Sequence, residues 1–195
     1  MAQPKILVAF YSSFGTNKRV AEIAAAAAEA AGAEVRLRRF AETAPMAVIE
    51  QQDGWKANLE SMQSIPEVSH DDMEWADGYF LSVPTRYGLP PSQMTTFTDM
   101  LGGIWRKGAL ANKTFTATTS AQTGHGGHEG TLHALYHMAM HWGTFIVPPG
   151  YADPVKFEDG GNPYGYSQSA GATPHEASIT YQARRLTETT AKLIA

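Results

Sequence analysis

Residues 5–17 read KILVAFYSSFGTN, an apolar run that changes abruptly into a polar loop. A short, continuous run of branched and aromatic residues, here Lys5 to Tyr11, is typical of a strand buried on both faces of a parallel sheet. The polar loop Ser12 to Asn17 precedes a helical pattern, because apolar residues from Val20 to Ala31 recur on one face. These residues therefore predict a strand, a loop and a helix that packs back onto the sheet.

The same alternation of strands and helices continues along the chain. Val35 to Phe40 alternates apolar residues with arginines, which is typical of a half-exposed edge strand. Further strands are expected at 78–83, 114–120 and 144–147, and helices at 55–61, 92–101, 130–142 and from 174, with Thr173 as the last N-cap. The expected fold is α/β: an open twisted parallel sheet with strand order 2-1-3-4-5, helices on both faces, and one domain over residues 1–195.

Composition excludes several functional classes. The chain has 195 residues, a net charge of -4 and no cysteine. The charge gives no basic excess for nucleic acid, and the missing cysteines exclude disulfide scaffolds, zinc-thiolate sites and cysteine nucleophiles. No apolar stretch is long enough to span a bilayer and the start shows no signal-peptide pattern, so a cytoplasmic protein without membrane insertion is expected.

Ligands of such sheets bind at the carboxyl ends of the strands, and three loops are expected there. The first, Ser12 to Asn17, gathers hydroxyls and backbone N–H groups at a helix N-terminus, an arrangement that binds phosphate. It lacks the lysine that ends a nucleotide-triphosphate loop, which favours a monophosphate. The alternative is an ordinary capped turn between a strand and a helix.

The second and third loops also admit two interpretations each. Residues 84–88 read PTRYG, where Tyr87 offers a flat apolar face and exposed amides could meet the edge of a planar heterocycle. The alternative is a surface turn whose Arg86 forms a salt bridge. Residues 123–130 are dense in glycine, which lets a ligand lie against the main chain, or else leaves the loop merely flexible.

Other features carry weaker signals. His133, His137 and His141 share one face of the expected helix, as a zinc site would require, but a polar face or a subunit contact is the favoured interpretation. No G-x-S-x-G pentapeptide supports a serine hydrolase. Trp105 is expected either in the core or as an aromatic wall. The unperiodic stretch from Pro148 to Ala172 predicts a functional or interface loop.

Taken together, the loops resemble one family. The order is SSFGTN, PTRYG, GGIW, TGHGGHE, a histidine before IVPPGY, and GGNPYGYSQSAG. This resembles the flavodoxin-like WrbA family of NAD(P)H:quinone oxidoreductases, from Lys5 to the last helix. The resemblance implies non-covalently bound FMN, NADH or NADPH and quinones as substrates, and a homotetramer whose flavin site is walled by neighbouring subunits.

By position, the resemblance also implies roles for individual residues. The residues implied to contact FMN are Ser12, Ser13, Phe14, Gly15, Thr16, Asn17, Thr85, Arg86, Tyr87, Ala121, Gln122, Thr123, Gly124, His125, Gly126 and His141. Trp105 and Phe14 would lie where quinone or nicotinamide stacks. The chain departs from the usual family pattern at Ala121, Gln122 and His125, which bears on substrate preference. No metal ligand and no catalytic side chain is implied.

The implied reaction is a two-electron, ping-pong reduction of quinones to hydroquinones, in which hydride passes through flavin N5. The alternative is a non-enzymatic flavodoxin that carries electrons between protein partners. Such carriers are typically much more acidic than this chain, whose charge of -4 offers little electrostatic steering. The enzyme is therefore the favoured hypothesis.

Overall fold

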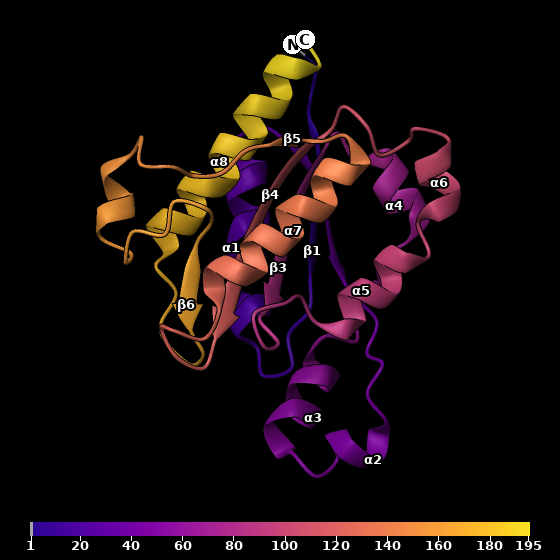
Figure 1. Cartoon of the computed structure of the whole chain (residues 1–195), viewed down its shortest axis with the longest axis vertical. Coiled ribbons are helices and arrows are strands. Elements are labelled where there is room, and N and C mark those ends of the chain that lie inside the picture. Colours follow the sequence, from indigo (N-terminus) through magenta and orange to yellow (C-terminus); the bar gives the residue numbers. More distant parts are fainter. Residues whose placement is uncertain (1) are drawn as a thin grey trace.

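A computed structural model describes residues 2–195, and its centre is a parallel sheet. The main strand order is β2-β1-β3-β4-β5, which confirms the expected order (Figure 1). The strands are β1 (Lys5–Phe10), β2 (Glu34–Arg39), β3 (Gly78–Pro84), β4 (Thr114–Ala121) and β5 (Phe145–Ile146). A sixth short strand, β6 (Ser167–Ser169), also pairs with β4. Strand β5 pairs with the start of β4 and β6 pairs with its end, so both lie along the same side of β4.

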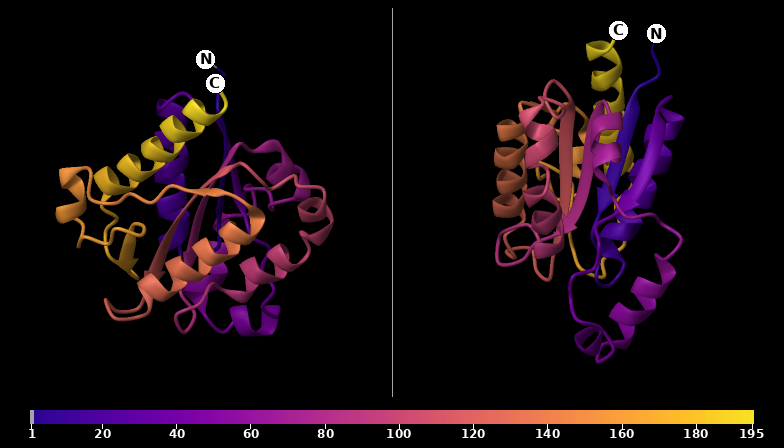
Figure 2. Two further views of the ribbon diagram at one scale, coloured as in Figure 1. Left: turned by 45° about the horizontal axis from the view of Figure 1, so that its top comes forward. Right: turned by 90° about the vertical axis from the view of Figure 1, so that its right-hand side faces the viewer.

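Helices cover both faces of the sheet (Figure 2). One face packs against α1 and α8, and the other packs against α4, α5, α6 and α7. The helices are α1 (Thr16–Ala30), α2 (Met46–Ile49), α3 (Asp53–Ser61), α4 (His70–Trp75), α5 (Ser92–Asp99), α6 (Gly102–Arg106), α7 (His128–Trp142) and α8 (Glu176–Leu193), with a 3-10 turn at Pro154–Phe157. None of the helices within residues 2–195 is both long and apolar enough to cross a membrane.

Strand β1 lies at the centre of both cores, as its continuous apolar sequence predicts. Leu7 and Ala9 belong to the core beneath α4–α7, whereas Ile6, Val8 and Phe10 belong to the core beneath α1 and α8. Successive side chains of a strand point to opposite faces, so a strand covered on both sides needs apolar residues throughout.

Strand β2 is the edge strand, and its arginines are held by one acidic residue. Asp72 of α4 is buried and accepts from Arg36 at 3.0 Å and from Arg38 at 3.0 Å. Ser69 and Asp72 also form a capping box that begins α4. Burial alone would raise the pKa of Asp72, but the hydrogen bonds from Ser69, Arg38 and Arg36 outweigh it and lower the pKa below its usual value.

Three expected helix starts were wrong, since α3 also begins two residues early, at Asp53. Helix α8 begins at Glu176 with His175, not Thr173, at the N-cap, because His175 Nδ1 accepts from the Ser178 N–H. The backbone N–H of His175 in turn donates to the Tyr166 hydroxyl at 2.8 Å, which fixes the chain before the helix. Helix α7 begins at His128, two residues earlier than expected.

The strand register brings three loops to one edge of the sheet. Because β1, β3 and β4 are parallel neighbours, their carboxyl ends lie together, at the lower end of the sheet in Figure 1. The Tyr11 N–H donates to Ser82 O at 3.1 Å, and the Thr85 N–H donates to Ser120 O at 2.8 Å. These bonds continue the sheet into the loops that follow β1 and β3.

Candidate functional site

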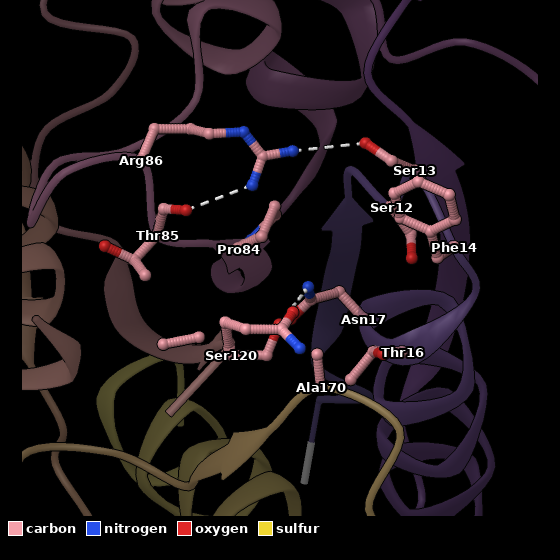
Figure 3. Close-up of a pocket in the computed structure, with 12 residues that line it drawn as sticks. Ser12, Ser13, Phe14, Thr16, Asn17, Pro84, Thr85, Arg86, Ser120 and Ala170 are labelled. Carbon is pink, nitrogen blue, oxygen red and sulfur yellow. Dashed lines mark hydrogen bonds between the residues drawn. The ribbon is translucent and has the colours of Figure 1, made fainter. Parts of the chain in front are cut away.

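A cavity of about 260 Å³ opens where the three loops meet (Figure 3). It is formed by the loop after β1, the turn after β3, the end of β4 and the segment that follows β6. Its lining residues are Ser12, Ser13, Phe14, Thr16, Asn17, Pro84, Thr85, Arg86, Ser120, Ala121, Gln122 and Ala170. Nine of the sixteen residues expected to contact FMN therefore line this cavity, whereas Gly15, Tyr87, Thr123, Gly124, His125, Gly126 and His141 do not.

The first loop presents free donors at the N-terminus of α1. Gly15 is the N-cap, with a left-handed φ of 92° that a side chain would strain. Within residues 2–195, the backbone N–H groups of residues 13–17 donate no hydrogen bond. The first turn of α1 carries no acidic residue, so the positive end of the helix dipole is not neutralised. Oriented N–H groups and a helix dipole together form an anion-binding site.

Two hydroxyls of this loop are also free, whereas its amide side chain is not. Neither Ser12 Oγ nor Thr16 Oγ1 makes a hydrogen bond with another described residue, and both residues line the cavity. Asn17 instead donates to Ser120 Oγ at 2.8 Å, and its oxygen atoms lie within hydrogen-bond reach of Ser82 Oγ. The Asn17 side chain therefore joins α1 to β3 and β4, and only its backbone N–H remains for a ligand.

Two residues of helix α3 contact the first loop. Asn58 Nδ2 donates to Ser12 O at 2.7 Å, and the ring of Phe14 lies 6.1 Å from that of Trp55. Phe14 nevertheless keeps 61% of its surface exposed beside the cavity. It is thus available as an aromatic contact for a flat ligand.

Arg86 is the one cationic side chain that lines the cavity among the described residues. Its Nη2 donates to Ser13 Oγ at 3.1 Å and its Nη1 donates to Thr85 O at 3.0 Å, so it links the first two loops (Figure 3). Ser13 Oγ donates onward to the Tyr11 hydroxyl, which donates to Glu42. Burial, with Glu42 nearby, raises the pKa of Tyr11 well above its usual value, so Tyr11 stays a neutral donor.

The second loop is a tight turn that exposes one aromatic ring. Arg86 and Leu89 exchange two backbone hydrogen bonds, at 2.7 and 3.0 Å, across Tyr87 and Gly88. Both central residues have positive φ, 54° and 82°, as in a type I′ turn. The Thr85 N–H is bonded to β4, and those of Arg86 and Gly88 are used within the turn, so only the Tyr87 N–H is free for a ligand, fewer than expected. The Tyr87 side chain is fully exposed.

The third loop packs closely on the second and exposes its main chain. A Cβ atom on Gly127 would lie 2.7 Å from Gly88 Cα, so this contact requires glycine. Residues 122–125 are exposed, and their backbone N–H groups donate to no residue within 2–195. The loop therefore adds a second set of free donors at the carboxyl edge.

Trp105 and His141 lie elsewhere in the subunit. The indole N–H of Trp105 donates to His141 O at 3.0 Å, and both residues line a separate hollow with Thr98 and Asp99. His141 is thirteen residues beyond His128 on α7, or roughly 20 Å along the helix at 1.5 Å per residue. Trp105 is 52% exposed, so the core interpretation is wrong. Neither residue touches the cavity of its own chain.

The histidine face of α7 points away from the core. His137 and His141 stack with ring centroids 5.3 Å apart, and His133 packs edge-on against Tyr164 at 4.4 Å. Leu132, Leu135 and Ala139 are buried on the opposite face, as expected. Within residues 2–195 no group of three or more histidine or carboxylate side chains is arranged to hold a metal ion.

Comparison with known families agrees with this geometry. The family model described as NADPH-dependent FMN reductase matches residues 5–156, which include β1 and all three loops of the site. The chain belongs to the NADPH-dependent FMN reductase family.

Individual relatives match this FMN reductase family member over nearly its whole length. A protein from Deinococcus radiodurans named NAD(P)H dehydrogenase (quinone) is 53% identical over 99% of this chain and 98% of its own. A protein of the same name from Caulobacter vibrioides is 36% identical over 97% of this chain and 98% of its own. Among solved structures, a flavodoxin, WrbA-like protein from Agrobacterium tumefaciens has a TM-score of 0.68 at 17% identity, covering 97% of this chain and 99% of that one. The last comparison establishes the flavodoxin-like fold.

One part of this family member's site was not found from the sequence. Ala170 lines the cavity because β6 pairs with the end of β4, and the Ala170 N–H donates to Ala121 O at 2.7 Å. Strand β6 has only three residues and lies within the expected long loop. Its three residues, Ser167, Gln168 and Ser169, are all polar, so no apolar alternation in the sequence marks them as a strand.

Proposed function

We propose that this protein is an FMN-dependent NAD(P)H:quinone oxidoreductase that reduces quinones by two electrons to hydroquinones. The observation that carries the proposal is the set of free N–H and hydroxyl groups on residues 12–17, at a helix N-terminus and beside two further loops with exposed backbone. The relatives named NAD(P)H dehydrogenase (quinone) supply the reaction class, since the fold alone does not specify a function.

The residues present fit FMN. The N–H groups of residues 13–17, with Ser12 Oγ and Thr16 Oγ1, would hold its phosphate, because a phosphate monoester is an acceptor-only dianion that matches a nest of free donors. Thr85, Arg86 and Tyr87 would line one side of the isoalloxazine. Residues 121–126 would contact the ribityl chain and the ring edge.

When bound, FMN supplies the redox chemistry, by accepting and donating hydride at N5. The protein contributes orientation and electrostatics. The Arg86 guanidinium and the free N–H groups of residues 122–125 would stabilise negative charge that develops on the ring. Phe14 would offer a flat surface that nicotinamide and quinone occupy in turn, as a ping-pong exchange requires. No side chain need act as a covalent nucleophile.

We also propose that the chain forms a single flavodoxin-like domain of the WrbA type and assembles as a homotetramer. His141 lies roughly 20 Å along α7 from His128, and neither Trp105 nor His141 lines the cavity of its own subunit, so they could wall a flavin site only in a neighbouring subunit. Phe157 is 71% exposed and stacks on Tyr151 at 5.4 Å, which supplies a further apolar contact surface. A cytoplasmic location follows from the proposed electron donor.

Purified protein tests this function directly. We expect a yellow protein that contains about one FMN per chain and turns over benzoquinone with NADH or NADPH, without any added reductase. An electron carrier would contain flavin but would not be reduced by either nucleotide. Protein that neither retains nor rebinds FMN would contradict the proposal.

A further inference from the structure

A second and larger cavity, of about 710 Å³, adjoins the first. The segment from Tyr151 to His175 forms most of its wall, and the rest comes from Gly124 in the loop before α7 and from His128 and Glu129 in the first turn of that helix. The two cavities border each other at the end of β6, where Ser169 lines the second and the next residue, Ala170, lines the first. A ligand at the first site could therefore extend into the second.

The second cavity has polar groups held in place at its wall. His128 is only 6% exposed, and its Nε2 atom has no hydrogen-bond partner within residues 2–195. Such an unpartnered buried atom is unfavourable unless a ligand or water meets it. Gln168 is fixed on both sides, since it accepts from the Tyr166 hydroxyl at 2.7 Å and donates to Ala172 O at 2.9 Å. Tyr164 adds a partly exposed aromatic ring.

The charges around this cavity are of one sign. Glu129, Glu158 and Asp159 line it, and no lysine or arginine of the described chain does. Lys156 lies behind the wall with no exposed surface, and it is ion-paired with Asp159 and hydrogen-bonded to Ser178. The cavity therefore presents acceptors and negative charge to whatever enters it.

We propose that this second cavity binds the adenosine half of the reduced nicotinamide nucleotide and selects NADH over NADPH. The inference rests on the proposed function, because the nicotinamide must reach a flavin in the first cavity. The Tyr164 ring suits a purine face, and carboxylates accept hydrogen bonds from a ribose diol. The 2′-phosphate of NADPH would bring two further negative charges to Glu129 and Glu158, where no lysine or arginine lines the wall and only histidines, among them His175 at 3.9 Å from Glu158, could offset them.

Steady-state kinetics of the FMN-loaded protein test this selection. The unmodified protein should show a kcat/KM for NADH at least about tenfold above that for NADPH. The variant Glu129→Gln/Glu158→Gln should reduce that ratio by about three- to tenfold, through a lower KM for NADPH. Glu158→Arg, which places a cation in the cavity, should reduce it further. Equal efficiency with both nucleotides in the unmodified protein, or a ratio unchanged by these variants, would overturn the proposal.

A hydride donor without adenosine provides the control. The donor 1-benzyl-1,4-dihydronicotinamide should support the same turnover in all three proteins, and AMP should compete with NADH better than adenosine 2′,5′-bisphosphate does. If the variants change turnover with the benzyl donor as much as with NADPH, the cavity acts on the flavin and the inference fails. No turnover with NADH, NADPH or the benzyl donor in the unmodified protein would instead refute the proposed function.

Discussion

Replacing Thr16 by valine removes one hydroxyl from the proposed phosphate site with almost no change of shape. Thr16 is the first residue of α1, and its Oγ1 makes no hydrogen bond with another described residue. Its loss leaves no protein group unpaired, so the effect on folding should be small. Any loss of ligand affinity then reports a contact between this hydroxyl and the ligand.

The expected magnitude follows from the charge of the acceptor. A hydrogen bond to a charged group contributes about 1.5–3 kcal/mol, and five backbone N–H groups would remain to hold the phosphate. Thr16→Val should therefore weaken FMN binding by about 1–2 kcal/mol, or roughly five- to thirtyfold in Kd. Adding Ser12→Ala should bring the total loss to about 2–3 kcal/mol.

Quenching of flavin fluorescence by the apoprotein measures these affinities, and riboflavin identifies the contact. Riboflavin lacks the phosphate, so its Kd should be nearly the same in Thr16→Val and in unmodified protein. Thr96→Val is a matched control, because Thr96 is an exposed residue of α5 outside the cavity. Unchanged FMN affinity, or equal losses for FMN and riboflavin, would refute the assignment of the phosphate to this loop.

Four further changes test other parts of the account. Trp105→Ala should raise the KM for quinone by about three- to tenfold. It should lower the free energy of unfolding by only about 1 kcal/mol, because the indole is half-exposed. A loss of about 3–5 kcal/mol, typical of a core tryptophan, with unchanged kinetics would exclude a substrate role. Phe157→Ser should leave the melting temperature within a few degrees yet reduce the mass measured by light scattering; a tetramer of unchanged mass would remove Phe157 from the interface. Asp72→Asn should lower the free energy of urea unfolding by about 2–4 kcal/mol, because it breaks two ion pairs at a buried carboxylate. The pKa of Asp72 is lowered on folding, so its contribution to stability should be present above about pH 4 and lost as pH falls through the folded pKa. The stabilities of the two proteins should therefore converge in an acid titration. Gly127→Ala should cost about 1–3 kcal/mol and weaken FMN binding, because a Cβ atom 2.7 Å from Gly88 Cα must displace the second loop; unaltered stability would show that the loops are not in contact.

The central layers of the fold could be predicted because their sequences are strongly periodic. Strand β1 is apolar and buried on both faces from Ile6 to Phe10, whereas in β2 apolar residues alternate with arginines and the strand lies at the edge of the sheet. Helices α1 and α7 each show one apolar stripe, which the structure buries. In these segments local pattern and tertiary packing favour the same structure.

Elements that depend on distant partners could not be predicted in this way. Strand β6 has three residues and exists because it pairs with the end of β4. The first turn of α8 is capped by His175, whose position is fixed by the Tyr166 hydroxyl, nine residues earlier. Helix α6 has five residues and contains two glycines, so its local helix propensity is low.

The candidate site shows the same division. The three loops could be predicted because each follows a strand with a clear sequence pattern, and neighbouring parallel strands bring the loops at their carboxyl ends together. The sequence did not indicate that Asn17 would be hydrogen-bonded to Ser120 and Ser82. Nor did it indicate that most backbone N–H groups of the Arg86–Leu89 turn would already be hydrogen-bonded within the protein. Both depend on hydrogen bonds between segments far apart in the chain.

Anaerobic titration of the FMN-loaded protein tests the central claim most directly. We predict that one equivalent of NADH bleaches the flavin absorbance without an added reductase, and that one equivalent of benzoquinone then restores it and yields one equivalent of hydroquinone. Flavin that stays oxidised with both NADH and NADPH, or reduced flavin that does not pass its electrons to benzoquinone, would contradict the assignment of this protein as an NAD(P)H:quinone oxidoreductase.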